Sequence, residues 1–379
     1  MPLAAEQTSA AAPPPHHLTV TVAKSALRAA VNRIARIVPA RAASPGLTLA
    51  RVEVAPGKLT LSGANLDCAI RVAVPVDATA TGTFAVPAAP LHQVINSAPG
   101  DEVTLEHRGA ELTVVSGPHR SRLQTAAPDA LAPLEFPEAF AGQVPAETLA
   151  ALLERTSYAA ATAEFQQSFR GVLLDLTAER ARAVATDGFR LAYQDAPPIP
   201  GLEAKALLPA KLASEVTRAF TEGDVFIDVS GDALVLADQT TTLKINLMSG
   251  KFPDYERVIP KGHAMHVTLD AKALRDLLAR VSLMSDKTAN NRVDLHVKDG
   301  RLTVTGEGSY GSAREELDVT QGGAESEIRL AVNASFLTAA VAPAEGAVTL
   351  NLNHGAAPLT VVDHEDPAYL ALVVPLKTQ

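Results

Sequence analysis

The segment "VPAETLAALL", residues 144–153, decides how this chain divides into structural units. An apolar residue and a proline end a predicted strand, and apolar residues at helical spacing follow directly. The same pattern recurs in five other segments: "VAKSALRAAV" (22–31), "VPAAPLHQVI" (86–95), "LPAKLASEVT" (208–217), "LDAKALRDLL" (269–278) and "VNASFLTAAV" (332–341). The first residues of successive segments are 58 to 64 positions apart. Six nearly even repeats argue against chance and indicate copies of one small unit.

Strand-forming segments follow each predicted helix. In "DEVTLEHRGAELTVV", residues 101–115, two alternating stretches flank a glycine turn, and the inward residues are Val103, Leu105, Leu112 and Val114. A further strand closes each unit, so the unit is strand, helix, strand, strand, strand. Two units together place two helices against one face of a joined antiparallel sheet, an α+β arrangement. We therefore predict three tandem similar domains, at residues 18–140, 141–260 and 261–379.

Length and composition are those of a globular protein with more than one domain. The chain has 379 residues, of which 47% are hydrophobic and 20% charged, and it has no 18-residue apolar run that would span a membrane. The net charge of −9 argues against a protein that coats nucleic acid with its whole surface, although it allows a locally basic face. The start, residues 1–17, lacks a basic region and an apolar region, which predicts a disordered Ala/Pro tail and not a signal peptide.

The single Cys68 excludes a disulfide framework and a cysteine metal site, and it fits a reducing cytoplasm. Because Cys68 lies in an alternating apolar stretch, we interpret it as a small core residue in preference to a nucleophile.

Motifs that suggest catalysis have simpler structural interpretations. "GEGSYG", residues 306–311, matches a dinucleotide fingerprint, but an alternating strand follows it where a helix is needed, so we predict a hairpin turn. The Asp-Gly pairs in "ATDG" (185–188) and "KDG" (298–300) are turn signals. His263 and His266 have no nearby third ligand. We predict neither a metal nor a cofactor, and the lack of a catalytic motif favours a scaffold or binding protein.

The connector "LMSGKFPDYERVIP", residues 247–260, holds two aromatics in a chain with ten Phe, five Tyr and no Trp. Pro253 and Pro260 stiffen a segment that must hold two domains at a fixed angle. That role does not explain exposed aromatic side chains at Phe252 and Tyr255. The connector is either a spacer, one wall of a binding pocket or both, and Tyr255 is either a pocket residue or a packing residue of the domain junction.

Charge separates the predicted helices from the predicted strands. On the first helix, the positions expected to face the sheet are Leu27, Val31, Ile34 and Val38, and the basic positions on the other side are Lys24, Arg28, Arg33 and Arg36. Acidic residues instead gather in turns and strands: Asp101, Glu102, Glu106, Glu307, Glu315, Glu316 and Asp318. A mildly basic helix side suits loose phosphate contacts with a polyanion, without base readout.

Three segments resemble motifs of one known family, the bacterial sliding clamps, which are the beta subunits of DNA polymerase III. They are "FRGVLLDLTAERARAVATDGFRLAY" (169–193), which ends in TDG-x-RLA, "GKFPDYERVIP" (250–260), which carries FPDY-x-RV-x-P, and "YLALVVPL" (369–376). The similarity extends from Leu18 onward over essentially the whole chain.

The resemblance implies a head-to-tail homodimer that closes a six-domain ring around double-stranded DNA, regardless of base sequence, and that has no catalysis of its own. It implies helices lining the hole and sheets forming the outside. The implied partners are the DNA polymerase III alpha subunit, the clamp loader and other proteins with a clamp-binding motif. Such partners dock a hydrophobic peptide between the second and third domains, in a pocket that corresponds here to Phe169, Thr186, Gly188, Phe189, Arg190, Leu191, Pro253, Arg257, Val258, Leu372, Val373, Val374, Pro375 and Leu376.

Other sites follow from the resemblance or from the helix pattern. The DNA-facing residues are Arg41 and Lys211 by resemblance, Lys24 and Arg28 by helix pattern, and Gln166 and Gln167 in the loop before the first motif. Leu123, Leu283 and Met284 match hydrophobic positions of the subunit interface, with an ordinary core role left open. Phe189 stands where relatives often have His, so the preferred peptide is expected to differ.

Two alternatives compete with a DNA-encircling clamp. One is an enzyme, such as a hydrolase that uses the turn residues Asp187 and Asp254. It needs a convergent acid–base pair, and the sequence offers none at a recognisable spacing. The other is a structural repeat protein whose ring or array does not hold DNA.

Overall fold

A computed structural model describes residues 17–163 and 167–377, and the predicted tail lies almost wholly outside them. The six repeats appear as six successive β-α-β-β-β units. In the first and second repeats the elements are β1 (His17–Ala23), α1 (Lys24–Ile37), β2 (Leu49–Ala55), β3 (Lys58–Ala64), β4 (Cys68–Pro75), β5 (Gly82–Pro87), α2 (Ala88–Ser97), β6 (Glu102–Arg108), β7 (Glu111–Ser116) and β8 (His119–Gln124).

The middle repeats contain β9 (Gly142–Pro145), α3 (Ala146–Ser157), β10 (Gly171–Leu176), β11 (Ala181–Thr186), β12 (Arg190–Ala196), β13 (Ala204–Pro209), α4 (Ala213–Ala219), β14 (Asp224–Ser230), β15 (Ala233–Ala237) and β16 (Thr241–Asn246). The last two contain β17 (Met265–Asp270), α5 (Ala271–Val281), β18 (Arg292–Lys298), β19 (Arg301–Gly308), β20 (Gly311–Asp318), β21 (Thr320–Gly323), β22 (Glu327–Asn333), α6 (Ala334–Val341), β23 (Ala347–Leu352), β24 (Leu359–Asp363) and β25 (Tyr369–Val373). The predicted fold class is thus confirmed.

Repeats pair through an exchange of first strands that the sequence did not reveal. β1 pairs with β6 of the second repeat, and β5 pairs with β2 of the first. The same exchange joins β9 to β14 and β13 to β10, and then β17 to β23 and β22 to β18. Each pair of repeats therefore contributes to two sheets, in place of the one joined sheet that we expected.

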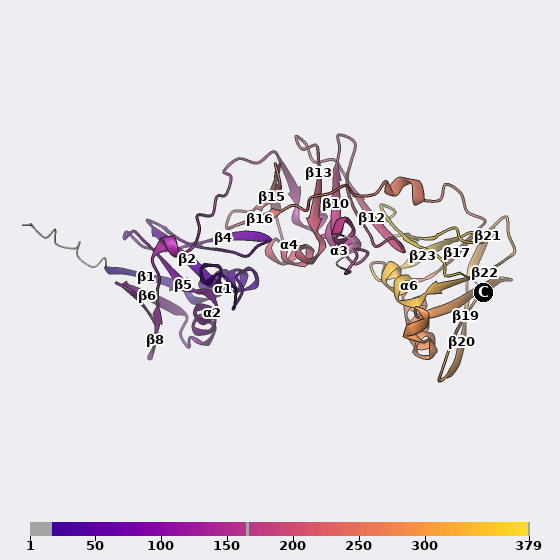
Figure 1. Ribbon diagram of the computed structural model, residues 1–379, viewed down its shortest axis with the longest axis horizontal. Coiled ribbons are helices and arrows are strands. Elements are labelled where there is room, and N and C mark those ends of the chain that lie inside the picture. The colour runs from indigo at the N-terminus through magenta and orange to yellow at the C-terminus, as the bar shows by residue number, and fades with distance from the viewer. Residues whose placement is uncertain (1–16, 164–166, 378–379) are drawn as a thin grey trace, which may run out of the picture. The chain divides into compact units, whose positions relative to one another are not determined.

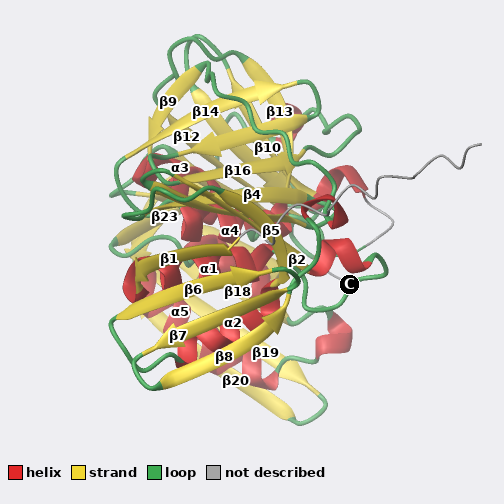
Figure 2. Ribbon diagram, turned by 90° about the vertical axis from the view of Figure 1, so that its left-hand side faces the viewer, coloured by secondary structure: helices red, strands yellow, loops and turns green. Residues whose placement is uncertain are grey.

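The chain forms two compact units. The first comprises the described residues up to Glu138 together with Ala237–Ile245, and the second comprises Ala139–Leu236 and the described residues from Asn246 onward. In the first unit, β8 is the outermost strand of the four-stranded sheet β1-β6-β7-β8, and Figure 2 shows β6, β7 and β8 side by side. In the second unit, β20 is the outermost strand of the sheet β20-β19-β18-β22.

Helix α1 shows why the repeats pack as they do. Leu27, Val31 and Ile34 are buried, as their helical spacing predicts, and Val38 just beyond the helix is buried as well. In the second unit, α3 packs on β10, β11 and β12 and lies beside α4 (Figure 1). Apolar helix faces thus cover one face of each sheet, and this burial supplies most of the stabilising free energy.

Strands β10 and β11 are buried at every residue, including positions whose side chains point away from α3. A sheet covered on one side alternates between buried and exposed positions, so a second segment of the chain must cover the face that points away from α3. The cover is the connector between β16 and β17, which includes the short helix η5 (Tyr255–Val258). Phe252 and Tyr255 are 9% and 6% exposed, so the expectation of exposed aromatics is wrong and the packing alternative for Tyr255 is correct.

The interpretations of turns and of Cys68 are confirmed. "GEGSYG" forms the hairpin between β19 and β20, and Asp299 and Gly300 take positive φ angles of 51° and 72° in the turn before β19. Cys68 is buried in the core, at 3% exposure. None of the described helices has the length and apolarity needed to cross a membrane.

Candidate functional sites

A tight turn between β11 and β12 presents Phe189 to solvent. Asp187 Oδ1 accepts hydrogen bonds from the backbone N–H groups of Phe189 and Arg190, at 2.9 and 3.0 Å. Thr186 Oγ1 donates to the Arg190 carbonyl at 2.7 Å, and Gly188 takes a φ of 89° that favours glycine. With its backbone fixed in this way, the Phe189 side chain is 62% exposed, which is unusual for a large aromatic residue.

Strand β25 and the residue after it lie directly beside this turn. β25 pairs antiparallel with β12, with Leu372 opposite Leu191 and Val373 opposite Arg190. Beyond β25, the Val374 N–H donates to the Phe189 carbonyl at 2.9 Å. Two of the three motifs, far apart in sequence, therefore form one continuous surface.

Arg190 joins this surface to helix α6. Its guanidinium lies 2.9 Å from Asp187 Oδ2, and its central carbon lies 4.7 Å from the ring centre of Phe336 and 5.7 Å from that of Tyr158. Stacking of this kind holds a cation in place while leaving an apolar rim. Phe336 was not predicted as a site residue, because on α6 it looks like one more apolar position of an apolar helix.

A buried pair of tyrosines fixes the junction behind Arg190. The hydroxyls of Tyr158, which directly follows α3, and Tyr369 on β25 lie 2.7 Å apart. Tyr369 donates to the Ala340 carbonyl at 2.7 Å. Burial raises the pKa of both phenols, so they remain neutral donors. The junction between the second and third predicted domains is thus held by specific hydrogen bonds within one compact unit.

The sheet segment β13-β10-β11-β12-β25 has an outer face, which points away from α3. This face carries two adjacent rows of side chains. The strand register places one polar row across four strands, Lys205, Asp175, Arg182 and Asp195, and one apolar row, Leu207, Leu173, Val184, Tyr193 and Leu370. Leu191 and Leu372 extend the apolar part, and Phe252 and Tyr255 of the connector pack onto it. The connector therefore crosses the sheet from the β13 edge to the β12–β25 boundary.

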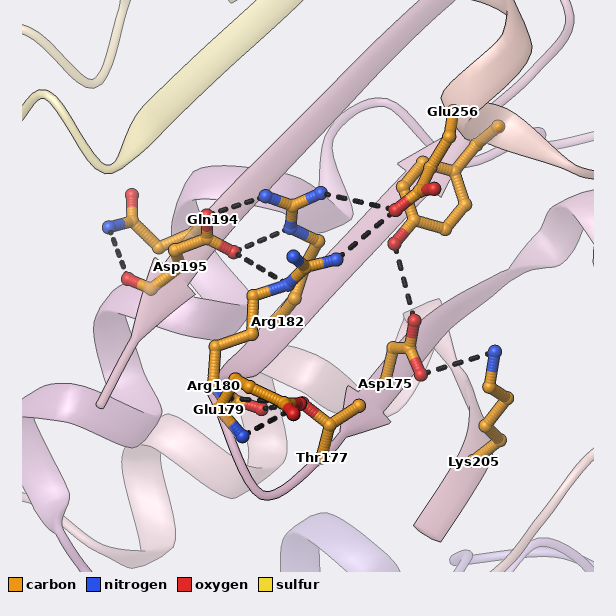
Figure 3. Close-up of polar contacts among 10 residues, drawn as sticks. Asp175, Thr177, Glu179, Arg180, Arg182, Gln194, Asp195, Lys205 and Glu256 are labelled. Carbon is orange, nitrogen blue, oxygen red and sulfur yellow. Dashed lines mark hydrogen bonds and ion pairs between the residues drawn. The ribbon is translucent and has the colours of Figure 1, made fainter. Parts of the chain in front are cut away.

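The polar row holds η5 in place (Figure 3). Arg182 forms two hydrogen bonds with Asp195, at 2.5 and 2.6 Å, and its guanidinium lies 4.0 Å from the ring centre of Tyr193. Burial alone would lower the pKa of Arg182, but its contacts with Asp195 and Tyr255 raise it, so the guanidinium stays charged. Glu256 lies 3.2 Å from Arg180 and 3.9 Å from Arg182, which ties η5 to β11 and to the turn before it.

The predicted pocket residues fall into three classes by exposure. The exposed members are Gly188, Phe189, Arg257 and Val258; the half-buried members are Phe169, Arg190, Pro253, Val374, Pro375 and Leu376; the buried members are Thr186, Leu191, Leu372 and Val373. The buried four support the surface from beneath and present no side chain to a partner. Arg257 forms an ion pair with Asp254 at 2.7 Å, and Pro253 lines a separate cavity.

The predicted DNA-facing residues differ in their surroundings. The Lys24 ammonium donates to the Ala98 carbonyl, and Arg28 Nε donates to Asn96 Oδ1 at 2.8 Å. Arg41, Gln167 and Lys211 are exposed, and Gln166 lies outside the described residues. The Lys24 ammonium therefore links the start of α1 to the end of α2, whereas Arg28 and Arg41 present their charge to solvent.

The three predicted interface residues lie outside the buried core. Leu123 is half-buried on β8, Met284 is half-buried in the short helix η6 (Ser282–Met284), and Leu283 in the same helix is 76% exposed. η6 packs beside β20. An exposed leucine next to an unpaired strand edge is a feature of a contact surface.

The acidic residues considered for hydrolysis are already paired with arginines. Asp187 pairs with Arg190 and Asp254 pairs with Arg257, so the two carboxylates suggested for hydrolysis are engaged separately in ion pairs. No group of three or more His, Cys, Asp or Glu residues within 17–163 and 167–377 has the geometry to hold a metal ion. His263 and His266 are neighbours, with ring centres 6.0 Å apart.

Comparisons with known proteins agree with this geometry. Residues 18–136, 143–254 and 256–377 match, in order, the N-terminal, central and C-terminal domains of the DNA polymerase III beta subunit. The beta sliding clamp of Pseudomonas aeruginosa is 30% identical over 366 residues, covering 93% of this chain and 98% of that protein. That of Escherichia coli K12 is 31% identical over 292 residues, covering 73% and 77%.

Solved structures agree as well. The crystal structure of a sliding clamp from Pseudomonas aeruginosa bound to griselimycin superposes with a TM-score of 0.91 at 26% identity, covering 96% of this chain and 100% of that one. The clamp of C. crescentus gives a TM-score of 0.88 at 26% identity, covering 96% and 99%. With its three domains matched in order, the chain belongs to the DNA polymerase III beta subunit family, the beta sliding clamps.

Proposed function

We propose that this protein acts as a ring of two chains that encircles duplex DNA and tethers a replicative polymerase to it. In this proposal the chain has three domains, 18–140, 141–260 and 261–379, and it tethers its partners without catalysing a reaction. The proposed place of action is the cytoplasm, in keeping with a chain that has a single cysteine. The further proposed partners are the polymerase alpha subunit, the clamp loader and other proteins with a clamp-binding motif.

The main support for ring closure is that two unpaired strand edges of the chain carry opposite charge. β8, "HRSRLQ", exposes Arg120 and Arg122, whereas β20, "GSAREELD", carries Glu315, Glu316 and Asp318. An unpaired edge is a template for another strand, and complementary charge selects its partner. We infer that β8 of one protomer joins β20 of its partner, with Leu123, Leu283 and Met284 in the apolar part of the contact.

Encirclement explains why a modest basic charge on the chain is enough to keep it on DNA. Arg28, Arg41 and Lys211 lie on the exposed side of helices or loops, with Gln166, Gln167 and Lys24 as weaker candidates. A ring holds DNA by topology, so its contacts with phosphates need not be tight, and loose contacts permit sliding. This fits a chain whose net charge is −9.

Retention on DNA tests the ring. After loading onto circular duplex DNA, the protein should stay bound through a salt wash and be released when the circle is cut once. The control is the same protein mixed with DNA that is already linear, which should lose it at once. Retention that does not change when the circle is cut would contradict encirclement.

The surface around Phe189 is the proposed docking site for partner peptides. Phe189, Val258, Val374 and Pro375 supply accessible apolar area, and Arg190 and Phe336 supply a cationic and an aromatic anchor. Such a mixture suits a short peptide with one or two large apolar side chains.

Truncation of Phe189 tests this site without disturbing the core. Phe189→Ala should weaken binding of a polymerase-derived peptide by about tenfold or more, because an exposed aromatic anchor is lost. The matched control is Phe226→Ala, since Phe226 is also a large exposed aromatic, 41% exposed on β14. Fluorescence anisotropy with a labelled peptide measures both, and equal affinities for the two variants would remove Phe189 from the site.

A further inference from the structure

A cavity of about 680 Å³ opens at the β13 edge of the outer face, apart from the Phe189 surface. Its walls come from β10, β13, the turn at Gly231 and Asp232, and the connector from Leu247 to Glu256. β11 and β12 separate β10 from β25. β25, which carries part of the Phe189 surface, therefore lies three strand spacings from β10, roughly 14 Å.

Asp175 is the distinctive group in this cavity. Its side chain is only 9% exposed, and its Oδ2 accepts a hydrogen bond from the Tyr255 hydroxyl at 3.3 Å. Its other oxygen, Oδ1, accepts no hydrogen bond from any described residue. A buried carboxylate oxygen without a donor is costly, so this atom marks a place where a donor is expected.

Lys205 satisfies Oδ1 only in part (Figure 3). Its ammonium lies 3.3 Å from Oδ1, close enough for an ion pair but without hydrogen-bond geometry. The Lys205 side chain is 71% exposed and sits on the edge strand of the sheet. Exposed ion pairs of this kind contribute little, so a better-placed cation can displace this ammonium.

The rest of the lining fits a cation that has an apolar body. Leu173, Leu207 and Phe252 belong to the apolar cluster of the outer face, and Met248 packs against it. Asp232 adds a carboxylate at the turn. Two other lining carboxylates, those of Asp254 and Glu256, already pair with Arg257 and Arg180.

We propose that this cavity binds an organic cation carried on an apolar body, whose ammonium or guanidinium head donates to Asp175 Oδ1. The body packs on Leu173, Leu207 and Met248. The same chemistry is offered by the arginine or lysine side chain of a peptide and by a free alkylamine. This site is additional to the proposed peptide surface, and it does not depend on ring formation.

Three probes with the same six-carbon body separate charge from apolar contact: hexylamine, hexanol and hexanoate. By titration calorimetry or NMR on the full chain, hexylamine should bind at least about tenfold more tightly than the other two. Asp175→Asn should abolish this preference. The matched control is Asp224→Asn on β14, which removes an exposed carboxylate outside the cavity lining and should leave the preference unchanged.

Lys205→Met supplies a test that does not alter the buried carboxylate. Because it removes the internal ammonium that competes for Oδ1, it should strengthen hexylamine binding severalfold. Lys251→Met removes another lining ammonium and should have a smaller effect. Weaker hexylamine binding in Lys205→Met, or equal binding of the three probes to the unmodified protein, would overturn the proposal.

The source of the cation is tested with a dipeptide. If N-acetyl-leucyl-argininamide competes with hexylamine for the cavity, this result supports a peptide side chain as the occupant. Hexylamine binding without competition from the dipeptide supports a free amine. Both results uphold the cation site, and they differ only in its source.

Discussion

The outer strands β8 and β20 show how one repeated fold acquires two different edges. Each is the last strand of a four-stranded antiparallel sheet, and each alternates between exposed and half-buried residues. β8 carries Arg120 and Arg122 and no acidic residue, whereas β20 carries Glu315, Glu316 and Asp318 with one arginine, Arg314. Both strands are outermost in their sheets, and their side-chain charge distinguishes the two edges.

This difference has a consequence for which strands can meet. Two β8 edges would place arginines opposite one another, and two β20 edges would place carboxylates opposite one another, both of which are unfavourable. A β8 edge beside a β20 edge is favourable. Opposite charge therefore permits a head-to-tail contact and disfavours the two like-edge contacts, which also limits aggregation through exposed edges.

Charge reversal on β8 should give the largest effect. In Arg120→Glu with Arg122→Glu, the two new carboxylates on β8 meet the acidic β20 edge across the proposed contact, and repulsion replaces attractive pairs. We expect dimer affinity to fall by about a hundredfold or more. Sedimentation over a range of concentrations measures the change. Arg108→Glu, on the inner strand β6 of the same sheet, is the control and should remain dimeric.

A compensating change makes this test specific. Adding Glu315→Arg with Glu316→Arg to the β8 variant exchanges the signs of both edges, and the dimer should return. If the β8 variant dimerises as well as the unmodified protein, then the edges do not meet and the proposed contact is wrong.

The sequence predicted the repeats well because their signals are local. Strand ends, helical periodicity and Asp-Gly turns depend on neighbouring residues, so the six units, the buried face of α1 and the hairpin at "GEGSYG" all followed. The sequence also showed that Glu315, Glu316 and Asp318 lie on a strand. It did not show that this strand is an edge, because edge position depends on the exchange of first strands between repeats.

Other features depended on register between distant strands. The row Lys205, Asp175, Arg182 and Asp195 joins residues of four strands, and no local pattern predicts their alignment. Phe252 and Tyr255 were expected to be exposed because the connector lacks regular structure, yet they cover the outer face of the sheet. Phe336 lies on helix α6 and was not predicted as a site residue, because its partner, Arg190, lies on a strand that is far away in sequence.

Removing the exposed leucine beside β20 should have an intermediate effect. Leu283 is 76% exposed in the isolated chain, and burial of a leucine side chain contributes about 1.5–3 kcal/mol. Leu283→Ala should therefore weaken the dimer by about tenfold without changing the Tm of the chain. Leu66→Ala is the control, because Leu66 is similarly exposed, at 80%, and belongs to neither edge. Equal dimer affinities for the two variants would place Leu283 outside the contact.

Acidification should give the smallest and most gradual effect, and it tests β20 without a change on β8. The hydrogen bond from Arg280 holds the pKa of Glu315 below its ordinary value of 4.5, and that from Arg314 does the same for Glu316. Carboxylates with a lowered pKa remain charged as the pH falls through 4.5, so their contribution to the dimer persists there and is lost only at lower pH.

Arg280→Gln removes the hydrogen bond to Glu315, which lets its pKa rise, and dissociation of the dimer should then begin at a higher pH. Lys272→Gln, which on α5 removes a cation paired with Asp276 at 2.6 Å, should leave the profile unchanged. A pH profile that is the same in Arg280→Gln and in the unmodified protein would mean that Glu315 carries no charge needed at the edge.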